Sequence, residues 1–165
     1  MKQARIDTIL IIYSLSINDD NLTENRLERI RQASPDAELS IIRNQDEWEE
    51  RSHEIAPKVN VIFGRLPAAW FQEMPNLRWV QLTAAGVDQL LMDSNEIVES
   101  DLIVTNSKGV PAIPVSEHIL ALMLTFSCEI HRSVRRQIKH RWNRRFSAVE
   151  LNGGTMGLIG VGKIG

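Results

Sequence analysis

The chain has 165 residues, of which 43% are hydrophobic and 24% charged, and its formal net charge is −2. This length and composition suit a globular protein with one core, or with one domain and part of a second. The near-neutral charge gives no reason to expect a nucleic-acid or membrane partner. The single cysteine, Cys128, excludes an intrachain disulfide, no apolar run reaches the roughly 18 residues of a membrane span, and no signal-peptide cleavage site follows the N-terminus. We therefore expect a cytoplasmic protein.

The first hundred residues alternate between predicted strands and predicted helices. Residues 6–15 form a nearly continuous aliphatic run, which is typical of a strand buried on both faces. The predicted strands are 6–15, 37–43, 59–64, 77–83 and 101–106, and the predicted helices are 23–33, 46–54, 67–74 and a short one ending near 92. Strict alternation of this kind predicts an α/β fold with a parallel sheet.

The longest predicted element is a helix from about Pro114 to Lys139. Its first half, residues 118–126, is apolar nearly all round, so we expect it to be enclosed and His118 to be a hydrogen-bonded interior residue. In its second half, apolar residues recur only at Ile130, Val134 and Ile138, between several arginines. We interpret the basic run as a solvated or subunit-facing surface and expect no nucleic-acid partner.

The last nine residues contain a glycine motif. Gly160, Gly162 and Gly165 have the G-x-G-x-x-G spacing, after an apolar run that predicts a strand at Leu158 and Ile159. In a dinucleotide site, such glycines permit a tight turn, close approach of the backbone to a pyrophosphate, and packing of the next helix. An incidental glycine-rich turn is the alternative.

The same segment nearly matches a phosphate-binding loop of nucleotide hydrolases. Gly157, Gly162 and Lys163 have the required spacing, but Ile164 stands where a hydroxyl would bind Mg²⁺. This side chain argues against a nucleotide hydrolase.

Three segments together resemble the D-isomer-specific 2-hydroxyacid dehydrogenase family, which includes phosphoglycerate dehydrogenase, glyoxylate/hydroxypyruvate reductases and formate dehydrogenase. They are L-R-W-V-Q-L-T-A-A-G-V-D at 77–88, G-V-P-A-I-P-V-S-E-H-I-L-A-L-M-L at 109–124 and G-L-I-G-V-G-K-I-G at 157–165. The resemblance extends over essentially the whole chain, and over about the first half of a typical family member.

This resemblance implies the domain organisation. Residues 1–102 correspond to a flavodoxin-like substrate domain without the C-terminal helix that returns to it, and residues 103–165 to the incomplete start of a Rossmann NAD(P)-binding domain. In the family, the helix at 114–139 contributes to a two-fold dimer, so a homodimer through this helix is expected.

The resemblance also implies binding residues. Backbone N–H groups of Ala85, Gly86 and Val87 would hold the carboxylate of a small 2-oxo or 2-hydroxy acid, with Gly64 and Arg65 in a second substrate-side loop. From the residues alone, an ordinary turn from strand to helix is the favoured interpretation of the A-A-G-V-D segment, although bare amides after a strand are suited to an anion. The positions implied to contact NAD or NADP are Ala85, Val115, Ser116, Gly160, Gly162, Lys163, Ile164 and Gly165.

The implied activity is NAD(P)-dependent hydride transfer to or from C2 of the acid. The family's catalytic arginine, carboxylate and histidine lie beyond the glycine motif, and none of His53, His118, His131 or His140 matches that histidine. We therefore assign no catalytic residue, expect this chain alone to be inactive, and expect no metal site because no Cys/His cluster occurs.

Two other classes of function are compatible with parts of the pattern. The first is a non-enzymatic dinucleotide sensor or corepressor of the same fold. The second is a standalone flavodoxin or receiver module, which fits poorly because Ser14 and Ser16 follow the first strand in place of an acidic pair, and the third strand ends at Gly64 and Arg65.

Overall fold

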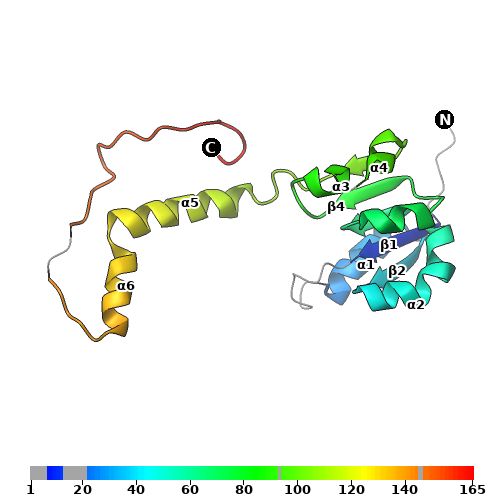
Figure 1. Cartoon of the computed structure of the whole chain (residues 1–165), viewed down its shortest axis with the longest axis horizontal. Coiled ribbons are helices and arrows are strands. Elements are labelled where there is room, and N and C mark those ends of the chain that lie inside the picture. The colour runs from blue at the N-terminus through cyan, green and yellow to red at the C-terminus, as the bar shows by residue number, and fades with distance from the viewer. Residues whose placement is uncertain (1–6, 13–21, 93, 145–146) are drawn as a thin grey trace. The chain divides into compact units, whose positions relative to one another are not determined.

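The computed structural model describes residues 7–12, 22–92, 94–144 and 147–165 (Figure 1). The chain divides into two compact units, Met1–Lys108 and Gly109–Gly165. The domain boundary predicted at 102 remains a prediction, because a compact unit does not by itself define a functional domain.

Unit 1 contains a five-stranded parallel sheet in the order β2-β1-β3-β4-β5. The strands are β1 Thr8–Ile12, β2 Glu38–Ile42, β3 Val61–Gly64, β4 Trp79–Leu82 and β5 Ile103–Thr105. Ile12 at the end of β1 pairs with Ile42 on one side and Gly64 on the other, so the strands end at a common edge. The predicted parallel α/β fold is confirmed.

The helices of unit 1 lie between the strands in sequence. They are α1 Glu24–Ala33, α2 Gln45–Ile55, the 3-10 helices η2 Ala56–Lys58 and η3 Ala68–Glu73, α3 Asp88–Met92 and α4 Asn95–Glu99. Two of them, η2 and α4, were not predicted. The side chain of Asn44 caps α2 by accepting a hydrogen bond from the Glu47 N–H at 2.8 Å. This cap fixes where the chain turns from β2 into α2.

One hydrophobic cluster of unit 1 lies on one face of the sheet, and Ile11 is buried on the opposite face. Leu10, Ile62 and Val80 occupy the same register position on neighbouring strands and are fully buried. Trp48 of α2 and Trp70 of η3 stack in this core, with ring centroids 4.3 Å apart. Trp142 of unit 2, by contrast, is exposed.

Unit 2 contains two helices where one was predicted. They are α5 Ala112–Ser127 and α6 Ile130–Ile138, whose axes differ by 67° (Figure 1). The chain bends because Glu129 adopts a left-handed conformation with φ of 53°. The prediction of an unbroken helix was wrong because neither glycine nor proline marks this break in the sequence.

The expected enclosure of the first half of this helix is also wrong. No residue of α5 is buried, and the His118 side chain is exposed. The apolar positions remain open because α6 is the only other helix in the described part of unit 2.

No single described helix is long and apolar enough to cross a membrane. The bent pair formed by α5 and α6 meets the length and composition test only when its two helices are taken together.

The strand predicted ahead of the glycine motif is absent. Residues 155–165 form neither helix nor strand, and Leu158 and Ile159 are exposed. A strand requires hydrogen-bonding neighbours, and the described part of unit 2 has no other strand to pair with. The apolar run therefore remains an extended segment.

Candidate functional site

A pocket of about 990 Å³ lies at the carboxyl edge of the sheet in unit 1. Its walls come from the ends of β1, β3 and β4 and from the segments that follow β2, β3 and β4. Of the predicted substrate residues, Gly64, Arg65 and Gly86 line this carboxyl-edge pocket. Ala85 and Val87 flank Gly86 in the same loop without lining it. In parallel α/β sheets, ligands bind at this edge.

In the loop after β4, the carbonyl groups of Ala84 and Ala85 accept hydrogen bonds, whereas the N–H groups of the next residues are left without an acceptor in the described part of the chain. The N–H of Ser107 donates to the Ala84 carbonyl at 3.0 Å, and the Asn106 side-chain amide donates to the Ala85 carbonyl at 2.9 Å. Among the described residues, the N–H groups of Ala85, Gly86 and Val87 donate no hydrogen bond. Open amides in an exposed loop are suited to an anion.

Gly64 is required by the backbone at the bottom of the pocket. Its φ is 136°, and a Cβ atom at this position would lie 2.1 Å from the carbonyl oxygen of Ile12. The close approach of β3 to β1 therefore excludes any side chain here. Glycine is therefore required at position 64 by the backbone geometry, whether or not a ligand binds.

The charged side chains that line the carboxyl-edge pocket are all positive. Arg43 and Arg65 line it, and none of the described residues that line it is an aspartate or glutamate. Sequence reasoning selected Arg65 and missed Arg43. Its position in the sequence could have identified it, because Arg43 directly follows β2 just as Arg65 directly follows β3.

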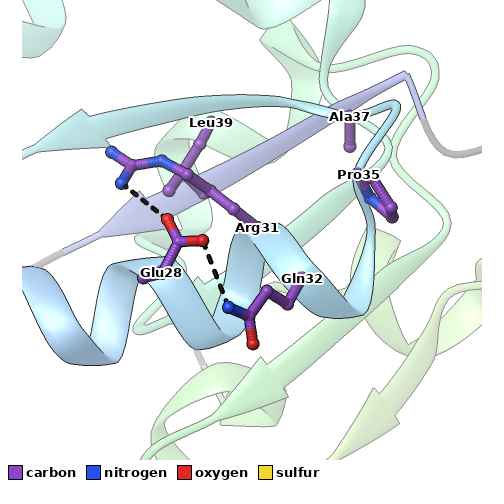
Figure 2. Close-up of a pocket in the computed structure, with 6 residues that line it drawn as sticks. All are labelled: Glu28, Arg31, Gln32, Pro35, Ala37 and Leu39. Atoms are coloured by element: carbon purple, nitrogen blue, oxygen red, sulfur yellow. Dashed lines mark hydrogen bonds and ion pairs between the residues drawn. The ribbon is translucent and has the colours of Figure 1, made fainter.

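A second pocket, of about 570 Å³, lies between α1 and the edge strand β2 (Figure 2). Its polar groups bind one another: the Glu28 carboxylate pairs with Arg31 at 3.6 Å and accepts a hydrogen bond from Gln32 at 3.2 Å. Hydrogen bonding and ion pairing with Glu24 also raise the pKa of Arg31. Polar groups that already have partners make this pocket the weaker candidate.

Unit 2 carries the remaining residues predicted to contact the cofactor. Val115 and Ser116 lie in the first turns of α5, where the Ser116 hydroxyl donates to the Ile113 carbonyl at 2.8 Å. The chain curls at its C-terminal end in Figure 1, and a Cβ atom on Gly165 would lie 2.9 Å from the Gly160 carbonyl oxygen. Gly160 has φ of 88°, and space around Gly160 and Gly162 is open.

The structure finds no group of three or more metal-ligating side chains among the described residues. Of the histidines, His131 contacts the Thr125 carbonyl at 3.3 Å through Nδ1 and lies beside the ring of Phe126. These contacts are those of a packed side chain.

The fold and the pocket therefore define a parallel α/β unit whose carboxyl edge is suited to binding an anion.

No family model matches the chain. Comparison with curated proteins finds D-3-phosphoglycerate dehydrogenase of Archaeoglobus fulgidus, which is 32% identical over 102 residues, or 61% of this chain and 19% of that protein.

Among solved structures, the chain resembles D-lactate dehydrogenase of Aquifex aeolicus in complex with NAD and lactic acid (TM-score 0.66, 23% identity, 95% of this chain and 45% of that one). It also resembles the NADPH-dependent glyoxylate/hydroxypyruvate reductase of Sinorhizobium meliloti in complex with NADP and sulfate (TM-score 0.66, 20% identity, 96% and 46%). At these identities, the likeness establishes the fold.

The predicted resemblance to D-isomer-specific 2-hydroxyacid dehydrogenases is confirmed by these relatives in sequence and in fold. The chain spans about a fifth of the length of the phosphoglycerate dehydrogenase and under half of the two structural neighbours.

Proposed function

We propose that this chain is part of an NAD(P)-dependent oxidoreductase that transfers a hydride between the nicotinamide and C2 of a small 2-hydroxy or 2-oxo acid. The observation that carries the proposal is the open set of N–H groups at Ala85, Gly86 and Val87, next to an arginine-bearing pocket without acids. The dehydrogenase and reductase relatives support it.

In this proposal, each part of the site has one task. The N–H groups of Ala85, Gly86 and Val87 bind the substrate carboxylate, and Arg65 supplies positive charge beside Gly64. The backbone at Gly160, Gly162, Lys163, Ile164 and Gly165 holds the pyrophosphate of NAD or NADP, and Ala85, Val115 and Ser116 contact its nicotinamide end. The open space around Gly160 and Gly162 is compatible with close approach of a diphosphate.

The bound cofactor would supply the hydride. This chain's own residues bind and orient the acid, and we assign no proton transfer to any of them. The 165-residue chain alone is accordingly expected to be inactive.

Two further features belong to the same proposal. We propose a homodimer formed through residues 114–139, supported by the exposed apolar side chains of α5, and a cytoplasmic location.

The test of the activity uses the full-length protein with NADH or NADPH and glyoxylate or hydroxypyruvate. We expect oxidation of one reduced cofactor, followed at its absorbance band, that depends on the 2-oxo acid. Cofactor binding without turnover on any 2-oxo acid would instead favour a dinucleotide sensor of the same fold.

A further inference from the structure

Asn106 holds the loop after β4 from outside the carboxyl-edge pocket. Its side-chain amide donates to the Ala85 carbonyl at 2.9 Å, and Gly86, the next residue of the loop, lines the pocket. Asn106 itself is exposed, directly follows β5 and does not line the pocket. It can therefore act on a ligand in the pocket only through Ala85 and Gly86.

The side-chain amide of Asn106 is itself held in place. Its Oδ1 accepts a hydrogen bond from the Lys108 N–H at 3.2 Å, two residues along the chain. Because the amide oxygen is used in this turn, the Nδ2 donors are left for the Ala85 carbonyl. The neighbouring Ser107 is anchored to the end of β4, since its hydroxyl donates to the Leu82 carbonyl at 2.9 Å. The donor that binds the loop is thus fixed by the protein itself.

Peptide geometry carries this constraint to the N–H groups that the proposed function uses. The Ala85 carbonyl and the Gly86 N–H belong to one peptide group, and in a planar trans peptide the two point in opposite directions. No peptide bond among the described residues is cis. A carbonyl bound to Asn106 therefore directs the Gly86 N–H away from the segment after β5. The Ser107 N–H, which donates to the Ala84 carbonyl at 3.0 Å, sets the Ala85 N–H in the same way.

We propose that Asn106 is a positioning residue of the carboxylate site, which orients the Gly86 N–H for the substrate carboxylate and strengthens it as a donor. Hydrogen bonds in a chain polarise one another, so a peptide group whose carbonyl is bound donates better through its N–H. The inference rests on the proposed function, which assigns the carboxylate to this loop. The Val87 N–H is not oriented in this way, because no described residue donates to the Gly86 carbonyl.

The first measurement uses the ¹⁵N-labelled 165-residue chain without any acid. Relaxation of the loop amides gives their order parameters, and Asn106→Ala removes the side-chain donor. We expect the order parameter of the Gly86 amide to fall from about 0.85 toward about 0.6. That of the Ala85 amide should stay unchanged, because the Ser107 backbone still holds its peptide group.

The second measurement is a titration with D-lactate, which carries a single carboxylate. The dissociation constant is taken from the shift of the Gly86 amide signal. We expect Asn106→Ala to weaken binding about tenfold, a loss comparable with that of one hydrogen bond.

Asn76→Ala is the matched control for both measurements. Asn76 is also exposed, and its side-chain amide donates to the Pro57 carbonyl at 2.6 Å, outside the carboxyl-edge pocket. The two variants lose a hydrogen bond of the same kind, so a merely structural effect would appear in both. We expect Asn76→Ala to leave the Gly86 order parameter and the binding of D-lactate unchanged.

The possible failures are distinguishable. A Gly86 amide that stays equally rigid in Asn106→Ala overturns the role of Asn106 and leaves the carboxylate site intact. The same holds if this variant keeps its affinity for D-lactate, or if Asn76→Ala loses as much. Failure of D-lactate to shift any amide from Ala85 to Val87 in the unmodified chain overturns the proposed carboxylate site and this inference together.

Discussion

Gly64 illustrates how one residue serves both the sheet and the pocket. Its backbone has φ of 136°, and the carbonyl oxygen of Ile12 occupies the place of its missing Cβ atom at 2.1 Å. A side chain would have to displace β3 from β1, and Gly64 also lines the carboxyl-edge pocket. Substitution therefore affects stability even in the absence of any ligand.

We predict that Gly64→Ala lowers the free energy of unfolding by at least about 2 kcal/mol, from backbone strain and the clash with Ile12. Urea denaturation followed by circular dichroism measures the effect. Gly157→Ala is the control, because a Cβ atom there meets nothing within 4 Å. Equal denaturation midpoints for the two variants would contradict the account.

The residues of the loop after β4 could be selected from the sequence, but their environment could not. The A-A-G-V-D pattern left an ordinary turn and an anion site as alternatives. Only the folded chain brings Asn106 and Ser107 to the carbonyls of Ala85 and Ala84, while the N–H groups of this loop donate no hydrogen bond among the described residues. Those contacts join positions about twenty residues apart, and no local pattern contains them.

At the scale of elements, capping decides where helices begin. Asn44 at the start of α2 accepts a hydrogen bond from the Glu47 N–H, whereas Thr23 at the start of α1 makes no side-chain cap. Both positions precede an acidic first turn, so they differ mainly in the cap itself.

We therefore expect Asn44→Ala to lower the free energy of unfolding by about 1 kcal/mol and Thr23→Ala by only a few tenths of a kcal/mol. Thermal denaturation of the two variants beside the unmodified chain provides the comparison. A loss at Thr23 as large as that at Asn44 would show that the hydrogen bond is not the source of the difference.

The helix of unit 2 shows where element prediction fails. No glycine or proline separates the apolar residues of α5 from the basic residues of α6, so the sequence predicts a single helix. The left-handed Glu129 interrupts it, with a buried side chain that pairs with Arg132. A left-handed glutamate carries no sequence signal, because this conformation is usually taken by glycine or asparagine.

At the scale of the whole molecule, the exposed apolar side chains of α5 need an explanation. Ile119, Leu120, Leu122, Leu124 and Phe126 are each between 44% and 64% exposed. Large exposed apolar surface marks an interaction site in many proteins. This exposure supports the proposed homodimer through residues 114–139.

We predict that the chain self-associates and that Leu120→Arg weakens its dimer at least about tenfold, because the substitution would bury a charge. Sedimentation velocity over a range of protein concentrations measures this association. Leu91→Arg is the control, since Leu91 is a similarly exposed leucine in α3. A monomer at every concentration, or equal effects of the two variants, would refute the proposed interface.

The sequence alone determined the parallel α/β fold, the order of elements in unit 1 and the resemblance to 2-hydroxyacid dehydrogenases. These depend on local periodicity and on short motifs, which the residues carry wherever the chain lies. The tertiary structure decided what depends on distant partners. It brought Arg43 and Arg65 to the lining of one pocket, made Gly64 obligatory against Ile12, and left Leu158 and Ile159 without a strand to pair with. Pairing and pocket formation need groups far apart in the chain, so local pattern could not supply them.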